Sequence, residues 1–284
     1  MKIGFIGDLI LSSDLVIHEQ ITDLLRRNDL NVANLEAPFI QEGMQPALRS
    51  GLHQLVTGPG MLQDLNIKAV SLANNHMKDY GQEGIEFTQK VLAQHGIQCF
   101  GAGSNLEEAL RPARFQMENQ SLNLWGFMQR FYSKRHFATA HKGGTAELRK
   151  EHMIRELDSS DADIKIVYNH WNLELESYPE PVNKDLAEEL ARHSNVVVGS
   201  HPHCIQGFQT AGNALIFHSL GNFSMPALEY SGTKLVEYPE MSRESMIVTI
   251  DFTGTNPQYD IHPITLDRSG SVVSIPNQEQ KKQI

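Results

Sequence analysis

The chain has 284 residues, of which 40% are hydrophobic and 20% charged, a composition typical of a globular protein with a sizeable core. Its formal net charge of −10 argues against non-specific nucleic-acid binding, which depends on an excess of Lys and Arg. Two cysteines, Cys99 and Cys204, are too few for a disulfide framework, and we expect both in the core. The alternative for Cys204, which follows His203 directly, is a soft metal ligand.

The apolar run at the start of the chain is too short to span a bilayer, and Asp8 interrupts it. No later window reaches the length of a membrane span, and no signal-peptide pattern follows the first run. We therefore expect no membrane segment and a cytoplasmic location, with a trimmed surface protein as the alternative.

Short apolar runs alternate with helical periodicities along the chain, which predicts an α/β protein. The expected strands cover residues 2–7, 30–35, 67–73, 97–100, 113–117, 121–127, 164–169, 195–198, 214–218, 246–252 and 259–265. The expected helices cover residues 14–27, 58–65, 82–95, 106–111, 147–157 and 182–193. This order favours a sheet that is mostly parallel at its centre, with antiparallel strands added late in the chain.

The remaining segments carry turn residues and predict irregular structure at 39–57, 129–146 and 225–242. The second is rich in basic side chains, and we expect it to be a mobile loop. No internal repeat and no Pro- or Ser-rich linker divides the chain. We therefore expect a single domain over residues 1–276, followed by a disordered polar tail over 277–284.

An H-x-H motif follows the apolar strand at 195–198, at the end where open α/β sheets bind ligands. Pro202 fixes its own φ near −65° and restricts the backbone of His201, so that the imidazoles of His201 and His203 can point at one centre. Imidazole is a good ligand for zinc, iron and manganese. The alternative is a surface turn that contains two polar residues.

Other strand ends carry similar chemistry. Taken singly, Asp8 could cap a helix, Asn75 could belong to a turn, and His170 could be a half-buried structural histidine. Together, carboxylates, an amide and imidazoles are the mixture that holds two divalent ions close together. The predicted metal ligands are Asp8, Glu36, Asn75, His170, His201 and His203.

Seven motifs extend this pattern along the chain: IGD at 6–8, ANLE at 33–36, SLANNHMKDYG at 71–81, GAGSNLEEALRP at 101–112, NHWNLE at 169–174, VVGSHPH at 197–203 and SLGNF at 219–223. Together they resemble the bacterial capsule synthesis protein family, the CapA or poly-γ-glutamate synthesis type, within the calcineurin-like metallophosphoesterase superfamily. The resemblance implies a four-layer αββα sandwich with mixed sheets.

The resemblance also implies a role for each candidate. One divalent ion, manganese, iron or zinc, would be held by Asp8, Glu36 and His203. A second ion would be held by Asn75, His170 and His201, with Glu36 bridging both. His76 resembles the histidine that protonates the leaving group.

The chain departs from the expected pattern at three positions. Ile10 stands where the superfamily has a metal-binding histidine, so the first ion lacks one ligand. Glu36 replaces the usual bridging aspartate. Asn172 follows the tryptophan of NHWNLE, where the capsule-type family would have glycine.

These features predict a metal-dependent hydrolase, associated with capsule or poly-γ-glutamate biosynthesis, that activates water on an anionic small-molecule or polymer substrate. Arg130, Lys134 and Arg135 are candidates for holding that substrate, although a solvated basic turn is the alternative. The competing functions are a γ-glutamyl amide-cleaving or transfer enzyme and a non-catalytic accessory protein that binds the polymer. The sequence does not indicate the substrate or the oligomeric state.

Overall fold

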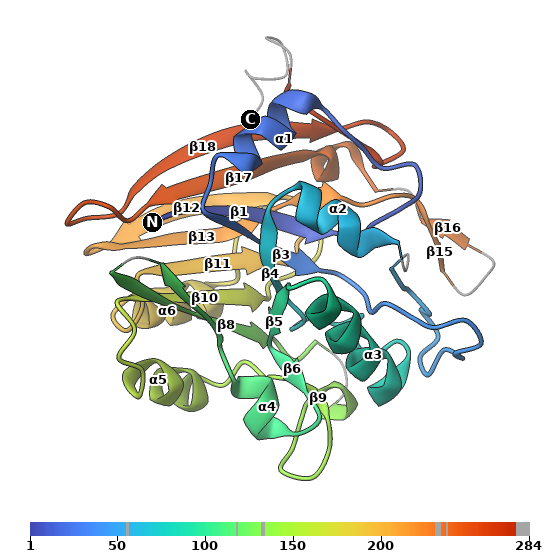
Figure 1. Cartoon of the computed structure of the whole chain (residues 1–284), viewed down its shortest axis with the longest axis horizontal. Helices are drawn as coiled ribbons and strands as arrows, with labels where there is room; N and C mark the ends of the chain where they lie inside the picture. The colour runs from blue at the N-terminus through green and yellow to red at the C-terminus, as the bar shows by residue number, and fades with distance from the viewer. Residues whose placement is uncertain (55–56, 118, 132–133, 231–233, 237, 277–284) are drawn as a thin grey trace.

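The computed structural model describes residues 1–276, except 55–56, 118, 132–133, 231–233 and 237 (Figure 1). The predicted tail, residues 277–284, lies outside the described residues. None of the helices in the described part of the chain is both long and apolar enough to cross a bilayer.

Most strands belong to two sheets. The first has nine strands, in the order β2 (Val16–Ile17), β19 (Val272–Ser274), β18 (Gln258–Leu266), β17 (Glu244–Asp251), β1 (Lys2–Leu9), β3 (Leu30–Leu35), β4 (Ile67–Ser71) and β5 (Gln98–Phe100), with β14 (Asn222–Ser224) paired to β1. The second has six, in the order β12 (Ile205–Ala211), β13 (Ala214–Leu220), β11 (Val196–Ser200), β10 (Ile164–His170), β8 (Gln120–Met128) and β7 (Ala113–Met117). Two short pairs complete the strands: β6 (Ala102–Gly103) with β9 (Gly144–Thr145), and β15 (Leu228–Tyr230) with β16 (Lys234–Val236).

The two sheets pack face to face, with a layer of helices outside each (Figure 1). Side chains such as Phe5, Val32, Ile166 and Phe217 fill the space between the sheets. The first sheet is covered by α1 (Glu19–Arg26), α2 (Gly58–Asp64) and α3 (Gly81–Gln94). The second is covered by α4 (Leu106–Leu110), α5 (Lys150–Asp158) and α6 (Pro181–Leu190). The expected four-layer αββα sandwich with mixed sheets is confirmed.

The central strands are buried on both faces, which explains their continuous apolar sequences. In β10, Ile166 and Tyr168 face the first sheet, whereas Val167 faces the helices. The Tyr168 hydroxyl donates to the carbonyl oxygen of Ile6 at 2.6 Å and so links the two sheets beneath their carboxyl ends. Burial, and then the nearby carboxylates of Asp8 and Glu36, hold the pKa of Tyr168 well above its usual value, so the phenol stays neutral.

Three expectations about elements were wrong. The single sheet expected from periodicity is two sheets, because β7, β8 and β10 to β13 pair among themselves. The first helix begins at Glu19 and not at residue 14, because residues 16–17 pair with β19. Strand β12 was not expected, since IQGFQTA lacks an apolar run; it is an edge strand and is half-exposed.

The segments expected to be irregular contain some regular structure. Residues 129–146 include the 3₁₀ helix Lys134–His136 and strand β9, and Phe137 and Ala146 are buried. Residues 225–242 include the β15–β16 pair. The interpretation of 129–146 as a loop without regular structure is therefore wrong for its second half.

Candidate metal centre

Asp8 lies near the carboxyl end of β1, between two parallel neighbours. The register places Asn34 of β3 on one side of it and Asn222 of β14 on the other. The amide of Asp8 donates to the carbonyl oxygen of Gly221 at 3.0 Å. A Cβ atom on Gly7 would lie 1.8 Å from that oxygen, so only glycine permits this approach. The IGD and SLGNF motifs therefore pack directly against each other.

The second sheet brings its histidines to the same place. His170 ends β10 and pairs with Ser200, the last residue of the parallel strand β11, so that His201 follows directly. The His170 and His201 ring centroids lie 4.6 Å apart, and those of His201 and His203 lie 5.9 Å apart. Parallel strands end at a common edge, which explains this cluster.

The backbone of the H-x-H turn is unusual. His201 has φ of +96° and His203 has φ of +54°, and for His201 this lies outside the extended conformations that a following proline favours. The amide of His201 donates to Oδ2 of Asp8 at 3.1 Å, and Leu175 donates to the carbonyl oxygen of Pro202 at 2.8 Å. These bonds hold a strained turn of the kind found at functional sites.

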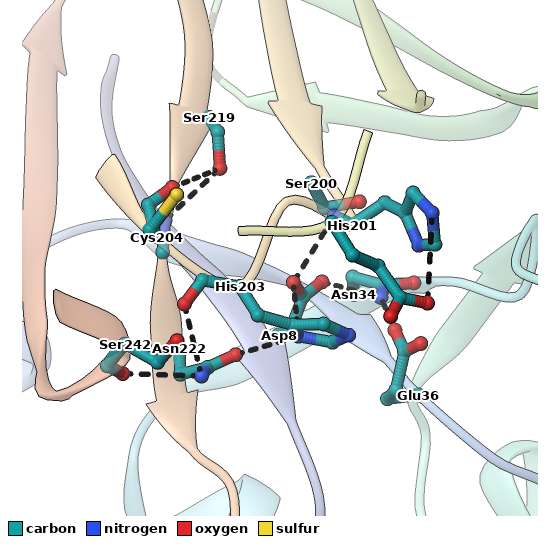
Figure 2. A network of polar contacts seen from close by, with 12 residues as sticks. Asp8, Asn34, Glu36, Ser200, His201, His203, Cys204, Ser219, Asn222 and Ser242 are labelled. Atoms are coloured by element: carbon teal, nitrogen blue, oxygen red, sulfur yellow. Dashed lines mark hydrogen bonds and ion pairs between the residues drawn. The ribbon is translucent and has the colours of Figure 1, made fainter. Parts of the chain in front are cut away.

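Asn34 ties the carboxylates together, and Figure 2 shows Asp8 between Asn34 and the pair His203–Asn222. Nδ2 of Asn34 donates to Oδ1 of Asp8 at 2.7 Å and also to Oε2 of Glu36. The other Asp8 oxygen, Oδ2, lies 3.4 Å from Nδ1 of His203.

The remaining ligand candidates join from the opposite side. Nε2 of His170 lies 2.9 Å from Oδ1 of Asn75 and 3.7 Å from Oε1 of Glu36. The fold therefore brings together all six residues predicted as ligands, from five separate stretches of sequence.

The electrostatics of the cluster are unbalanced. Asp8 and Glu36 are buried, and among the described residues no Lys or Arg pairs with either. Burial, and then the charge of Asp8, raise the pKa of Glu36 well above its usual value. Burial, and then neighbouring imidazoles, lower the pKa values of His170 and His201 well below the usual value. For His203, burial opposes protonation, but the contact with Asp8 outweighs it and raises the pKa.

This donor set fits divalent cations. Glu36 Oε1 and His201 Nδ1 are buried without a hydrogen-bond partner among the described residues. Unpaired carboxylates are costly to bury, and a cation would compensate them. Buried oxygen donors beside neutral imidazoles suit manganese, iron or zinc.

Potential ligand atoms form two groups, each within 4.8 Å. One contains Asp8, Glu36 and His170; the other contains His201, His203 and Glu174, a residue the sequence analysis did not select. This grouping cuts across the expected division between a first and a second ion, so that division stays a prediction.

His76 lies beside the cluster in the turn that follows β4. Its ring is buried, and its Nδ1 lies 3.1 Å from Oδ2 of Asp79. The same Asp79 oxygen accepts a bond from the amide of Leu52 at 2.9 Å, so the carboxylate is fixed in place. Asp79 thus orients His76, a role the sequence analysis missed although the i, i+3 spacing could have indicated it.

The three basic candidates have different environments. Arg130 pairs with Glu147 and lies over the Phe137 ring, 5.8 Å from its centroid, so this contact does not support its assignment to a substrate. Lys134 begins the 3₁₀ helix Lys134–His136. Arg135 helps to line a cavity of about 370 Å³, together with Ala47, Leu48, Lys78, Gly81, His136 and Lys142.

Asn34 and Asn222 were also missed as site residues. Oδ1 of Asn222 lies 2.9 Å from Nδ1 of His203, and its Nδ2 donates to the carbonyl oxygen of Ser242 at 3.1 Å. Both asparagines are buried within strands, and a polar residue inside a buried strand is the sequence signal that could have revealed them.

Comparison with known proteins identifies the family. Residues 12–227 match the family model described as bacterial capsule synthesis protein PGA_cap. The chain belongs to this capsule synthesis protein family. The suspected resemblance is therefore confirmed.

Two curated relatives of the family are similar to the chain. The capsule biosynthesis protein CapA of Bacillus anthracis is 24% identical over 218 residues, which cover 73% of this chain and 53% of that protein. The PGA biosynthesis protein CapA of Bacillus subtilis (strain 168) is 26% identical over 213 residues, covering 73% and 56%. The chain spans about half the length of these relatives.

Solved structures share the fold. A novel phosphatase from Mycoplasma pneumoniae has a TM-score of 0.58 at 11% identity, covering 99% of this chain and 96% of its own. A hypothetical protein from Thermus thermophilus has a TM-score of 0.57 at 16% identity, covering 93% and 98%. A putative 5'-nucleotidase from Staphylococcus aureus has a TM-score of 0.51 at 13% identity, covering 99% and 57%. The chain thus shares its overall fold with these three proteins.

Proposed function

We propose that this capsule-family protein is a metal-dependent hydrolase that acts on an anionic substrate of capsule or poly-γ-glutamate biosynthesis. The observation that carries the proposal is the pair of buried carboxylates, Asp8 and Glu36, which face three imidazoles and no Lys or Arg among the described residues. Two divalent ions held there would supply Lewis-acid polarisation and a water of lowered pKa.

The ligand set divides between anchoring and bridging roles. In the proposed arrangement Asp8 and His203 hold one ion, and Asn75, His170 and His201 hold the other. Glu36 would contribute to both, since its two oxygens have different neighbours: Oε2 accepts from Asn34, and Oε1 lies 3.7 Å from Nε2 of His170. Asn34 orients both carboxylates, and the Ser200 hydroxyl, 3.0 Å from Nδ1 of His170, orients that ring.

His76 holds the proton for the leaving group in this proposal. The contact between its Nδ1 and Asp79 selects the orientation and tautomer of the ring. Such a positioned histidine supports general acid catalysis, which typically contributes about 10²–10⁴-fold to a rate.

The cavity lined by Lys78, Arg135 and Lys142 would receive the anionic substrate, because three basic side chains border it on a chain whose net charge is −10. Two of them also donate to backbone carbonyl oxygens: Lys78 to Gly143 at 2.9 Å and Lys142 to Arg135 at 2.8 Å. A γ-linked polyglutamate, which carries a carboxylate on every residue, suits this site and the PGA biosynthesis named for one relative.

An activity screen on metal-loaded protein tests the proposal. The substrates are p-nitrophenyl phosphate, its bis-ester and γ-glutamyl p-nitroanilide, and the control is the double variant Glu36→Ala, His201→Ala. Turnover of at least one substrate by the parent, lost in the control, supports a hydrolase. Equal turnover by parent and control rules out this site.

A second function is favoured by Ile10, which leaves the first ion short of a ligand. In this alternative the protein binds polymer through its metals without cleaving it. The parent would then bind poly-γ-glutamate in a metal-dependent way but show no turnover in the same screen.

A further inference from the structure

Position 10 leaves a gap in the proposed metal centre. Ile10 is buried, and its backbone is held on both sides by Ser224, whose carbonyl oxygen accepts from its amide at 2.9 Å and whose hydroxyl donates to its carbonyl at 2.9 Å. The isoleucine side chain cannot serve as a ligand. A further protein ligand would give the ion held by Asp8, Glu36 and His203 a fourth donor.

We propose that Glu174 is this missing ligand, an inference that rests on the proposed function. Oε1 of Glu174 lies 4.0 Å from Nε2 of His201, and its carboxylate groups with His201 and His203 within 4.8 Å. About half of the Glu174 side chain is exposed, so its carboxylate closes the solvent side of a cluster whose other members are buried.

The direction in which Glu174 points is itself informative. An exposed glutamate ordinarily reaches solvent or a Lys or Arg partner. Within the described part of the chain, Glu174 pairs with neither cation type; its ion-pair contact is with His201. A carboxylate beside two imidazoles, one of which has a buried and unpartnered Nδ1, is an arrangement of donors that suits a divalent cation.

Two hydrogen bonds anchor the loop that carries Glu174, one to the H-x-H turn and one to strand β12. The amide of Leu175 donates to the carbonyl oxygen of Pro202 at 2.8 Å, and Nε2 of Gln206 donates to the carbonyl oxygen of Glu176 at 2.8 Å. Leu175 adopts φ of +61°, a conformation that these bonds hold in place. Glu174 is therefore fixed relative to the two histidines it faces.

The backbone at position 172 accommodates asparagine in place of the expected glycine. Its φ is +69°, a conformation that glycine adopts readily and that asparagine tolerates better than most residues. The side chain then adds bonds that glycine could not make: Nδ2 donates to Gln206 at 3.0 Å, and Oδ1 accepts from the amide of Glu180 at 3.0 Å and from Asn183 at 2.9 Å. The substitution keeps the turn and stiffens the loop around Glu174.

A manganese titration of Glu174→Gln, followed by calorimetry and by electron paramagnetic resonance, tests this assignment. The matched control is Glu176→Gln, which removes the same charge from the same exposed loop. We expect two ions in the parent and in the control. The weaker of the two binding events is expected to be the ion held by Asp8 and His203. In Glu174→Gln the affinity for this ion should fall about tenfold or more, since even groups that only support a ligand are worth roughly 10–100-fold.

A second variant guards against a folding defect. Glu174→His replaces the carboxylate with another metal-binding group and should retain more of the weaker event than Glu174→Gln does. Parent-like binding of both ions by Glu174→Gln overturns the inference, even if its turnover is lost. If the parent itself binds no manganese, the proposed function is wrong. Failure of the Glu174 assignment and failure of the proposed function therefore give different results.

Discussion

The two sheets contribute different chemistry to the candidate metal centre. The carboxyl ends of β1, β3 and β4 in the first sheet supply oxygen donors, namely Asp8, Glu36 and Asn75. The carboxyl ends of β10 and β11 in the second sheet supply the imidazoles of His170, His201 and His203. Neither sheet carries a complete ligand set, so the centre forms only where the sheets pack together.

The difference also sets the energetics of the metal-free protein. The oxygen side buries two carboxylates without a Lys or Arg partner among the described residues, which opposes folding. The nitrogen side buries His170 and His201, whose pKa values are well below the usual value, so these rings are neutral and carry no buried charge. In the metal-free protein, replacing a buried carboxylate of the first sheet should therefore increase stability, whereas replacing a buried neutral imidazole of the second sheet should not.

Replacing Glu36 should have the largest effect, because it contacts both halves of the centre. Glu36→Gln should abolish retention of both ions through dialysis. At neutral pH the same variant should be more stable than the parent in the metal-free state, because burial and Asp8 raise the pKa of Glu36, and a carboxyl group with a raised pKa opposes folding above its unfolded-state pKa. Thermal melts with and without EDTA measure both effects. A metal-free Glu36→Gln that melts below the parent would contradict the account of the oxygen side.

The imidazole of His76 should separate chemistry from metal binding. His76→Ala should bind both ions but lose about 10²–10⁴-fold in turnover. Asp79→Asn should lose part of that turnover, since it weakens the contact that orients the ring. Steady-state kinetics and elemental analysis of the same preparations check this. Loss of metal from His76→Ala, to the extent seen in His201→Ala, would make His76 a ligand.

His203, one of the three imidazole donors, is oriented by Asn222 of the first sheet. Asn222→Ala removes the contact with Nδ1 of His203, so metal affinity should weaken roughly 10–100-fold. Ser219→Ala serves as a control, because its hydroxyl donates to the carbonyl oxygen of Cys204 and touches no proposed ligand. Competition titration with a fluorescent chelator distinguishes the two variants. Equal affinities would show that His203 needs no support.

His218 offers a smaller test of what burial does to an imidazole that has no carboxylate partner. Burial, and then the charge of Lys184, lower its pKa to about 4, and neither ring nitrogen has a hydrogen-bond partner in the described structure. The unfolded chain takes up a proton below about pH 6.5 while the folded chain resists it, so stability is complete above that pH and falls as pH drops toward 4.

The loss of folding stability caused by His218 should reach at most about 2 kcal/mol between pH 7 and pH 5. His218→Leu should flatten that part of the stability profile, measured by urea denaturation at each pH. His262→Leu is a control, because that ring is less buried and its pKa is lowered less. A parent-like pH dependence in His218→Leu would remove the assigned role.

The candidate ligands could be chosen from the sequence because each follows a recognisable apolar strand. The strand ends after residues 35 and 169 were placed within one residue of the observed ends of β3 and β10. Periodicity alone, however, could not distribute the strands between two sheets, because pairing depends on contacts distant in sequence. The helix beginning at residue 14 failed for the same reason: the partner of residues 16–17 lies near residue 272.

The supporting residues were harder to predict. Asn34, Asn222 and Asp79 act through bonds to the predicted residues, and those bonds exist only once the registers are set. Glu174 sits in a loop without periodicity, and its proximity to His201 depends on positive φ values at Asn172 and Leu175. Such geometry leaves little trace in a single sequence.

The most direct test of the centre is an anomalous-difference map from crystals of the protein loaded with manganese, recorded near the manganese edge. We expect two peaks at the carboxyl ends of the two sheets, both within bonding distance of Glu36, one also near Asp8 and His203 and the other near Asn75, His170 and His201. Maps with no peak at these residues, or with manganese bound only elsewhere, would contradict the proposed metal centre.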